Sequence, residues 1–140
     1  MKIKVPNKRE LQAAKRIMAS KLDVIGYTPS KNLDKKFLKN RVYIAKADNE
    51  VVGVITFFIE SSNMEITEIA AKYEGWGIGT ALIDYVINKC KEESISKLWC
   101  WSLKQYNAEG FYAKMGFEER ILLQKHWFNQ DCWIFAKVIK

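Results

Sequence analysis

Hydrophobic residues at helical spacing mark the first element of the chain. Apolar side chains recur every three or four positions, at Leu11, Ala14, Ile17, Met18 and Leu22. This is the spacing of one helix face. Asn7, followed three residues later by Glu10, matches the start of a capping box. The pattern predicts a helix over residues 8 to 22 and a second, shorter helix over residues 30 to 40.

Runs rich in β-branched and aromatic residues follow and predict strands. Residues 42–45 and 51–58 are two such runs, and Asp48-Asn49-Glu50 lies between them. Aspartate and asparagine are typical of turns, so the two runs predict a hairpin. A third strand is predicted over residues 64 to 71.

Helical spacing returns after a glycine-rich corner and continues to about Glu93. A strand over residues 95 to 103 and a short helix over residues 107 to 115 follow. Gly116 is suited to end that helix, because the residue after a helix is often left-handed. Two final strands are predicted over residues 117 to 123 and 132 to 139, with a loop between them.

The order of these elements predicts the fold class. A strand–helix–strand unit lies in the middle, and it needs a right-handed crossover between parallel strands. The flanking hairpins are antiparallel, so the sheet is mixed and the class is α/β or α+β. A length of 140 residues predicts one domain, spanning residues 1–140.

Composition and charge narrow the function classes. The chain is 49% hydrophobic, with 23 basic and 16 acidic residues and a net charge of +7. This hydrophobic content excludes intrinsic disorder as the main state. The charge favours an anionic partner, such as nucleic acid, acidic lipid or a phosphorylated small molecule. The chain has four arginines, Arg9, Arg16, Arg41 and Arg120. A nucleic-acid-binding face needs more, so we expect no nucleic acid as partner. We expect no membrane as partner either, because the chain has no run of about 18 apolar residues.

The cysteines and the amino-terminal residues predict the compartment. Cys90, Cys100 and Cys132 form no CxxC pair, and His126 is the one histidine. A disulfide framework and a Cys/His zinc site are therefore not expected, and we predict no metal. The first residues lack the apolar run of a secretory signal, and no run of about 18 apolar residues occurs. Free thiols without a signal predict a reducing cytoplasm.

Three glycines stand where the third strand meets the following helix, at Gly75, Gly77 and Gly79. The first N–H groups of a helix have no acceptor inside it and carry partial positive charge, so such a junction can hold a phosphate. A tight turn or a close helix–sheet contact is the alternative. The chain contains no GxxxxGK[ST] motif, and Thr80 stands where GxGxxG requires glycine.

Two segments resemble the GNAT acetyltransferase superfamily. Residues 69–82 resemble its central motif, in which a strand leads through [RQ]-G-x-G-[IL]-G into a helix, and residues 107–117 resemble its F-Y-x-x-x-G-F block. The resemblance spans about residues 40–140. It implies a mixed, mostly antiparallel sheet with a central splayed parallel strand pair, flanked by about four helices.

The resemblance also implies an activity. Members transfer an acetyl group from acetyl-CoA to an amine of a small molecule or protein, by direct attack in a ternary complex, and homodimers are common among them. Carried over position by position, the residues implied in binding the cofactor are Ile69, Ala70, Ala71, Glu74, Gly75, Trp76, Gly77, Ile78, Gly79, Thr80, Asn107 and Tyr112. Pantetheine is expected to pair with the main chain at Ile69 and Ala71.

The resemblance places Tyr112 at the position of the catalytic acid. A phenol donates a proton or a hydrogen bond while neutral, and packing beside Phe111 is the alternative. Glu65 and Glu68 are candidates for the base, on opposite faces if the strand alternates regularly. Ordinary exposed strand carboxylates are the alternative for both, and His126 is a further candidate base.

Three positions depart from the family pattern, and the mildest is Ala71, which replaces the usual proline. Glu74 stands where arginine or glutamine is usual, and a carboxylate repels a diphosphate, so its side chain is expected to point to solvent. Asn107 lies closer to Tyr112 than is common. Glu74 keeps a second function open, that of a coenzyme A-binding sensor without turnover. Five tryptophans are expected mainly in the core, with an aromatic acceptor pocket as the alternative.

Overall fold

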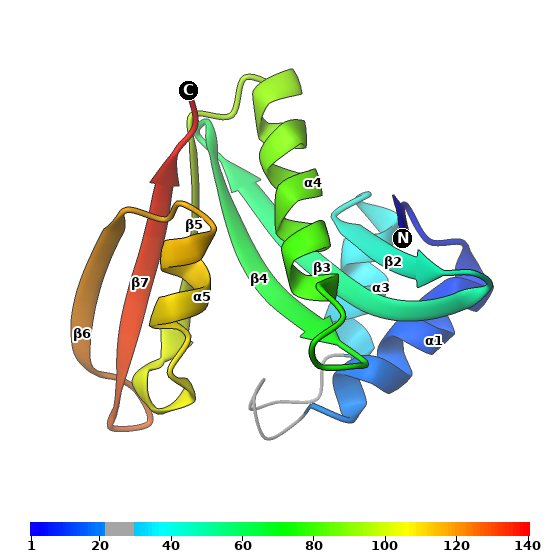
Figure 1. The fold of residues 1–140 in the computed structure, drawn as a ribbon, viewed down its shortest axis with the longest axis horizontal. Coiled ribbons are helices and arrows are strands. Elements are labelled where there is room, and N and C mark those ends of the chain that lie inside the picture. Colours follow the sequence, from blue (N-terminus) through cyan, green and yellow to red (C-terminus); the bar gives the residue numbers. More distant parts are fainter. Residues whose placement is uncertain (22–29) are drawn as a thin grey trace. The chain divides into compact units, whose positions relative to one another are not determined.

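The computed structural model describes residues 1–21 and 30–140. The elements in chain order are β1 (Lys2–Lys4), α1 (Lys8–Ala19), α3 (Ser30–Leu38), β2 (Val42–Ala47), β3 (Glu50–Glu60), β4 (Asn63–Ala71), α4 (Ile78–Glu92), β5 (Lys97–Leu103), the 3-10 helix η1 (Lys104–Tyr106), α5 (Glu109–Lys114), β6 (Glu119–Trp127) and β7 (Gln130–Val138) (Figure 1). None of the described helices is long and apolar enough to cross a membrane.

The seven described strands form one mixed sheet in the order β1-β2-β3-β4-β5-β7-β6. The pair β4–β5 is parallel, whereas β1–β2, β2–β3, β5–β7 and β6–β7 are antiparallel. The predicted class, a mixed and mostly antiparallel sheet with flanking helices, is therefore confirmed. Contacts divide the chain into two compact units. Unit 1 comprises Met1–Phe58 with Ile66–Val86, and unit 2 comprises Ile59–Glu65 with Ile87–Lys140.

Unit 1 packs helices on both faces of its strands. One face carries an aliphatic cluster from α1, α3 and the strands, made of Leu11, Ala14, Ile17, Met18, Leu33, Val42, Ile44, Val51, Val54 and Ala70. On the other face, α4 approaches β3 closely at Gly53, where an added Cβ would collide with the side chain of Ile78. Glycine is required there because the helix occupies the space of a side chain.

The start of α1 follows the local prediction. The Asn7 side chain accepts a hydrogen bond from the Glu10 N–H at 2.8 Å, and Glu10 accepts one from the Asn7 N–H at 2.9 Å. This reciprocal pair is the predicted capping box. The helix ends at Ala19, whereas the sequence predicted residue 22, which lies outside the described residues.

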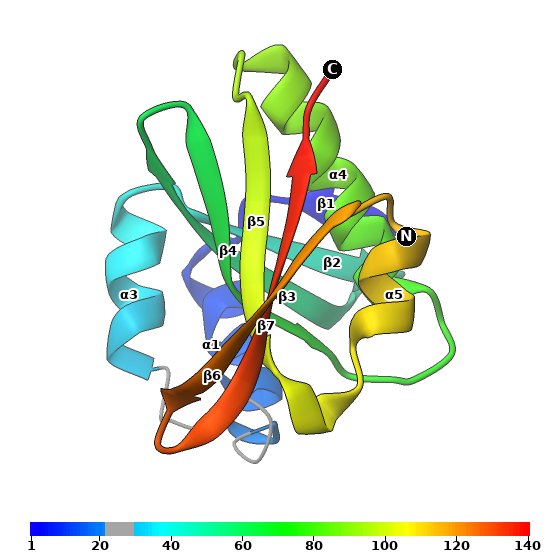
Figure 2. The ribbon, with the colours of Figure 1, turned by 90° about the vertical axis from the view of Figure 1, so that its left-hand side faces the viewer.

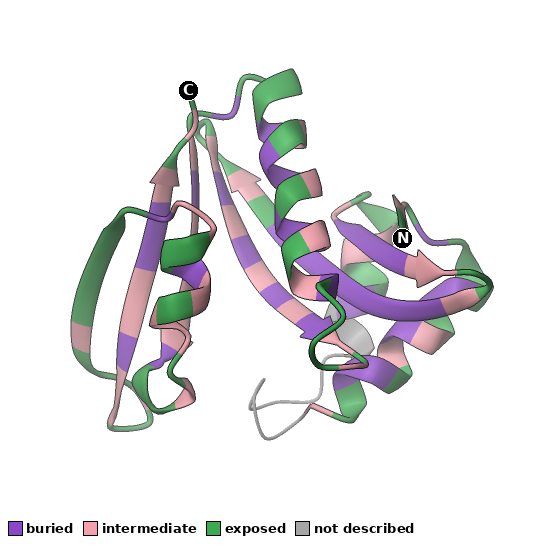
Figure 3. Ribbon diagram, in the orientation of Figure 1, coloured by how far each residue is buried: buried purple, intermediate pink, exposed green. Residues whose placement is uncertain are grey.

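Unit 2 is built on β5, β7 and β6, with α5 packed on one face (Figure 2). Residues alternate along β5, so that Leu98 and Cys100 are buried while Trp99 and Trp101 are half-buried. The outer strand β6 is exposed along nearly its whole length (Figure 3). Its sequence mixes polar and apolar residues without regular alternation, which explains why the hydrophobic pattern did not predict where β6 ends.

The structure corrects three expectations. β1 and η1 were not predicted, because three residues are too few for a periodic signal. β6 extends to Trp127, so His126 lies in a strand and not in the predicted loop over residues 124–131. A register shift after Leu123 and a positive φ at Lys125 interrupt the alternation, and the turn is confined to Phe128 and Asn129.

Candidate active site

The corner between β4 and α4 has the backbone of an anion cradle. Gly75 and Gly77 have φ of +78° and +73°, and a Cβ added at either would meet nothing within 4 Å. The first hydrogen bond of α4 runs from the Ala81 N–H to the Gly77 carbonyl. The N–H groups of Ile78, Gly79 and Thr80 therefore precede the helical ladder. Open space beside helix-start donors fits a bound diphosphate.

Side chains from β3 and the corner hold this backbone in place. Glu50 accepts hydrogen bonds from Lys72 at 2.5 Å and from the Tyr73 hydroxyl at 2.6 Å. These two bonds lower the pKa of Glu50. The Tyr73 ring stacks on Trp76 with centroids 4.4 Å apart. The sequence signalled Glu50 only as turn chemistry, because its partners lie more than twenty residues away.

The predicted cofactor-binding residues of unit 1 differ in how far their side chains are buried. Ala70 and Ile78 are buried, so their side chains serve packing. Glu74, Trp76 and Thr80 are exposed, and the expectation that the Glu74 carboxylate lies at the surface is confirmed. Ile69, Ala71 and Gly79 are half-buried, and Gly75 and Gly77 are exposed. A ligand at this corner would therefore meet main-chain groups together with the exposed side chains of Glu74, Trp76 and Thr80.

The two candidate base residues of β4 differ in environment. Glu68 is 5% exposed and accepts a hydrogen bond from the Thr56 hydroxyl at 2.6 Å. The alternative that Glu68 is an ordinary exposed strand carboxylate is therefore wrong. Glu65 is half-buried, and its register partner on β5 is Trp99.

Burial alternates regularly along β4, with Glu65, Thr67 and Ile69 half-buried and Glu68 buried, so the predicted alternation of this strand is confirmed. Thr56 of β3 contacts both kinds of position. Its hydroxyl lies 2.7 Å from that of Thr67 and 2.6 Å from the Glu68 carboxylate. Thr56 is a neighbour of the candidate base that no local signal in the sequence indicated.

Tyr112 lies in the core of unit 2. It is 6% exposed, stacks on Phe135 with centroids 4.7 Å apart, and meets the edges of Phe111 and Phe117. Its hydroxyl is hydrogen-bonded to the Cys100 thiol, and burial, with this neighbour, raises the pKa of Tyr112 well above its ordinary value. The phenol therefore keeps its proton over the whole physiological range.

Cys100 is the contact of Tyr112 that the sequence did not reveal. Burial raises the pKa of its thiol to about 12, against a smaller opposing effect of the Tyr112 hydrogen bond and a contribution from Glu65 in the direction of burial. Cys100 lies on β5 and Tyr112 on α5, so only the tertiary fold brings them together. All three cysteines are buried free thiols.

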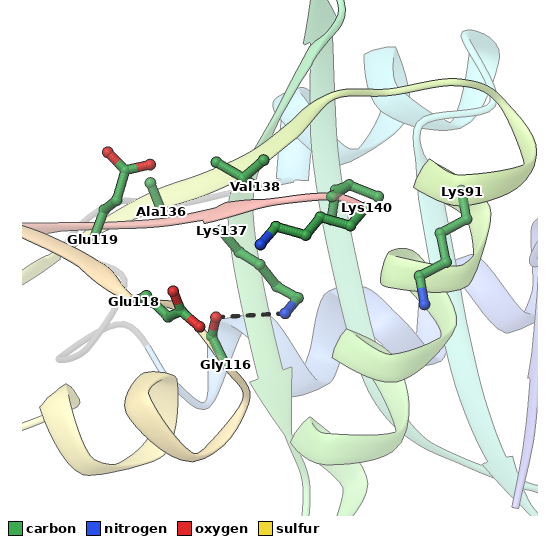
Figure 4. Close-up of a pocket in the computed structure, with 9 residues that line it drawn as sticks. Lys91, Gly116, Glu118, Glu119, Ala136, Lys137, Val138 and Lys140 are labelled. Atoms are coloured by element: carbon green, nitrogen blue, oxygen red, sulfur yellow. Dashed lines mark hydrogen bonds between the residues drawn. The ribbon is translucent and has the colours of Figure 1, made fainter.

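Gly116 ends α5, the helix that carries Tyr112. Gly116 has φ of +85°, as predicted for the residue after a helix. Lys137 of β7 donates a hydrogen bond to the Gly116 carbonyl at 3.4 Å. A cavity of about 300 Å³ adjoins Gly116. Figure 4 shows Lys91, Lys137 and Lys140 among the residues that line it.

Two further residues that the sequence analysis named as site candidates, Asn107 and His126, lie in unit 2. Asn107 is exposed and left-handed, with φ of +53°, and its N–H bonds to the Lys104 carbonyl, so it ends η1. His126 packs against Trp101 with ring centroids 5.4 Å apart. Across the described residues, no group of three histidine, cysteine, aspartate or glutamate side chains is arranged to hold a metal ion.

The mixed sheet with flanking helices defines an α/β protein, and its glycine corner leads directly into a helix start. Residues 12–117 match the acetyltransferase (GNAT) family, and the chain belongs to it. An uncharacterized N-acetyltransferase of Methanocaldococcus jannaschii is 34% identical over 92 residues, or 63% of this chain and 59% of that protein. The chain spans about half the length of the curated relatives it matches, between 44% and 59%.

Solved structures show the same fold. The ribosomal-protein-S18-alanine N-acetyltransferase of Escherichia coli has a TM-score of 0.79 at 19% identity, covering 99% of this chain and 94% of that one. N-acetylglutamate synthase from Neisseria gonorrhoeae, complexed with coenzyme A and N-acetyl-glutamate, has a TM-score of 0.81 at 15% identity, covering 99% of this chain and 35% of that one.

Proposed function

We propose that the protein is an acetyl-CoA-dependent N-acetyltransferase that moves an acetyl group to a primary amine by direct attack in a ternary complex. The observation that carries this proposal is the glycine corner, where two residues of positive φ lead into a helix start beside open space. Membership of the acetyltransferase (GNAT) family supports it. Coenzyme A bound by a protein of similar fold supports the cofactor.

In this proposal the corner holds the diphosphate through its main chain. The N–H groups of Ile78, Gly79 and Thr80 donate to it, and the positive end of α4 favours its charge. The main chain of Ile69 and Ala71 pairs with the pantetheine arm. Acetyl-CoA supplies the acetyl group as a thioester, so that a C–N bond forms as the C–S bond breaks, the amine loses a proton and the sulfur gains one.

Tyr112 has the proposed role of donating that proton to the sulfur. Its raised pKa supports this role, because an acid must still carry its proton at working pH. Cys100 has the role of a positioning residue that orients the hydroxyl. Burial of the ring between Phe135 and its aromatic neighbours supports a fixed orientation.

The proposed base is one of the two β4 carboxylates, Glu65 or Glu68. An ammonium with an ordinary pKa of roughly 10 must lose a proton before it can attack. Single substitutions to glutamine separate the two, because glutamine keeps the size and removes the charge. The base variant should lose kcat most strongly at low pH, where fewer amines are neutral. Equal and small losses in both variants would exclude both residues as the base.

The remaining properties follow from the proposed activity. The acceptor is an amine of a small molecule or a protein, and residues 1–140 act as one domain. The three free thiols support a reducing, cytoplasmic location. The proposed chemistry is proton transfer and acyl transfer, and it invokes no metal. A homodimer is expected from the family resemblance, and light scattering in solution would measure it.

Two measurements test the proposal. Acetyl-CoA should raise the unfolding midpoint, since a ligand that binds only the folded state stabilises it. Addition of amines should then release free thiol, and the buried protein thiols should contribute little background. Stabilisation without thiol release from any amine would favour the sensor over the enzyme. Absence of both effects would exclude the two functions together.

A further inference from the structure

The sheet of unit 2 has two chemically different faces. Cys100 pairs in register with Phe135, and both contact Tyr112 on the side covered by α5. We call this side the Tyr112 face. Alternation along β5 places Trp99 and Trp101 on the other side, the Trp99 face. The two faces therefore offer a buried phenol on one side and accessible indole rings on the other.

A groove of about 310 Å³ lies on the Trp99 face. Its apolar lining comes from Trp99, Ile121, Ile134 and Ala136. Lys97 and Glu119 line it too, and they form an ion pair with each other at 3.1 Å. Small-molecule sites are typically concave and mainly apolar, with a few polar groups, and their volumes begin at roughly 300 Å³.

Aromatic rings continue this surface along the sheet. Trp101 is the register partner of the groove residue Ile134. Its indole lies 5.4 Å from both the His126 and Trp127 rings, measured between centroids, and Trp127 meets Phe128 at 4.9 Å. We call these rings, together with Trp99, the aromatic row. Phe128 is 79% exposed, so the row continues to the surface. Contiguous apolar surface is a feature of ligand-binding and interaction sites.

A carboxylate stands at the edge of the aromatic row. Glu65 of β4 is the register partner of Trp99, and partners in neighbouring strands present their side chains on the same face. Glu65 is also one of the two proposed bases. A primary ammonium drawn to Glu65 would therefore place the rest of its molecule over the indole of Trp99 and the groove beside it.

We propose that the groove and the aromatic row bind the acceptor, and that the acceptor is an arylalkylamine, a single ammonium joined to an aromatic body. This inference rests on the proposed function. Rings of the row stack on an aromatic body, and their faces also attract a cation. A polyamine would need further carboxylates, whereas Glu119, which lines the groove, is already paired with Lys97.

Kinetics with matched amines test the proposal. 2-Phenylethylamine and ethylamine carry the same ammonium and differ in the phenyl ring, and spermidine supplies extra charges without a ring. Burial of a ring of this size predicts a kcat/KM for 2-phenylethylamine about 10- to 100-fold above that for ethylamine. Spermidine should resemble ethylamine.

Two tryptophan variants assign the effect to one face. Trp101→Leu should raise KM for 2-phenylethylamine about tenfold, with kcat and the constants for ethylamine nearly unchanged. Trp101→Phe, which keeps a ring, should recover part of the loss. Trp133→Leu is the matched control, because Trp133 pairs with Ser102 and contacts Arg120 on the Tyr112 face. It should leave the preference for 2-phenylethylamine unchanged.

Each result bears on one of the two proposals. Equal kcat/KM for 2-phenylethylamine and ethylamine, or a higher value for spermidine, would overturn the arylalkylamine assignment while acetyl transfer itself stands. If acetyl-CoA neither stabilises the protein nor is turned over, the proposed function fails. Binding of 2-phenylethylamine, followed by tryptophan fluorescence of the wild type and Trp101→Leu, then decides the groove assignment by itself. No binding, or equal binding by both proteins, would overturn it.

Discussion

Unit 1 and unit 2 carry their candidate functional groups in different parts of the polypeptide. In unit 1 the important groups are main-chain N–H groups at a glycine corner, and the charged side chains around it brace the backbone. In unit 2 the important groups are side chains, above all Tyr112 and the aromatic row. Backbone groups survive most substitutions, whereas a phenol or an indole does not. The glycine corner of unit 1 should therefore tolerate side-chain changes that Tyr112 and the aromatic row do not.

The largest expected effect is in unit 2. Tyr112→Phe removes the proposed acid and keeps the ring stacked on Phe135, so kcat should fall about 100-fold or more. Acetyl-CoA binding should change little, because the cradle is main chain. Wild-type kcat should also show no alkaline decline from this group below its ordinary pKa of 10.0, since burial raises the pKa of Tyr112.

Tyr106→Phe is the matched control for this substitution. It removes a hydroxyl from the half-buried tyrosine at the end of η1 and should retain nearly full kcat. Full activity in Tyr112→Phe would leave only a packing role for the ring. The contrast between the two units would then lose its main support.

The next effect concerns the charged scaffold of unit 1. Burial opposes ionisation of Glu10, but hydrogen bonds from Lys4, the Asn7 N–H and Lys46 outweigh it and lower the pKa of Glu10 from 4.5 to about 2. Glu10→Gln should lower the free energy of unfolding at neutral pH by about 1–3 kcal/mol. Acetyl-CoA binding should be unaffected where the variant is folded.

The pH dependence of that difference has a definite sign. A carboxyl group whose pKa is lower in the folded state stabilises fully above its unfolded pKa and less as pH falls. The stability gap between wild type and Glu10→Gln should therefore shrink between pH 4.5 and about 2. Denaturant titrations across this range measure it, with the exposed Glu60→Gln as control. A gap independent of pH would contradict the assigned ionisation.

A smaller effect is expected when the cradle backbone itself is strained. Gly77→Ala forces a side chain into a left-handed conformation with φ of +73°, at a cost of about 1–2 kcal/mol. Acetyl-CoA affinity should fall about tenfold if that strain shifts the corner. Calorimetric titration measures the affinity. Gly110→Ala is the matched control, because Gly110 lies in α5 without positive φ or close neighbours, and it should not weaken binding.

The smallest effect is expected at the residue that departs most from the family pattern. Glu74 is exposed, and the interaction of an exposed charge is worth at most about 1 kcal/mol. Glu74→Gln should therefore tighten acetyl-CoA binding no more than about fivefold, and the gain should vanish at high salt. A much larger gain would mean that this carboxylate faces the diphosphate directly.

Local features of the sequence predicted the parts of the fold that depend on neighbouring residues. The capping box at Asn7 and the corner at Gly75 and Gly77 each involve residues within a few positions of one another. A short window of sequence is therefore enough to predict both features. The predicted strands are also present in the structure, apart from differences at their ends. Alternation of apolar and polar residues indicates directly which side chains are buried.

Contacts between distant segments escaped prediction for a physical reason. Glu50 meets Tyr73, Thr56 meets Glu68, and Cys100 meets Tyr112 only after the sheet has formed. No residue type or spacing in the sequence indicates that two such distant residues are in contact. The end of β6 was misjudged because its polar, exposed residues and the irregularity near Lys125 carry no alternation.

The missing side chain at Gly53 has a consequence for ligand capture. Because α4 packs directly on β3 at this point, the helix that begins at the corner is held against the sheet without the help of a ligand. Donors that are already oriented lose little conformational entropy on association. A bulkier residue at position 53 would lift the helix and convert a preorganised receptor into one that must be ordered by its own ligand.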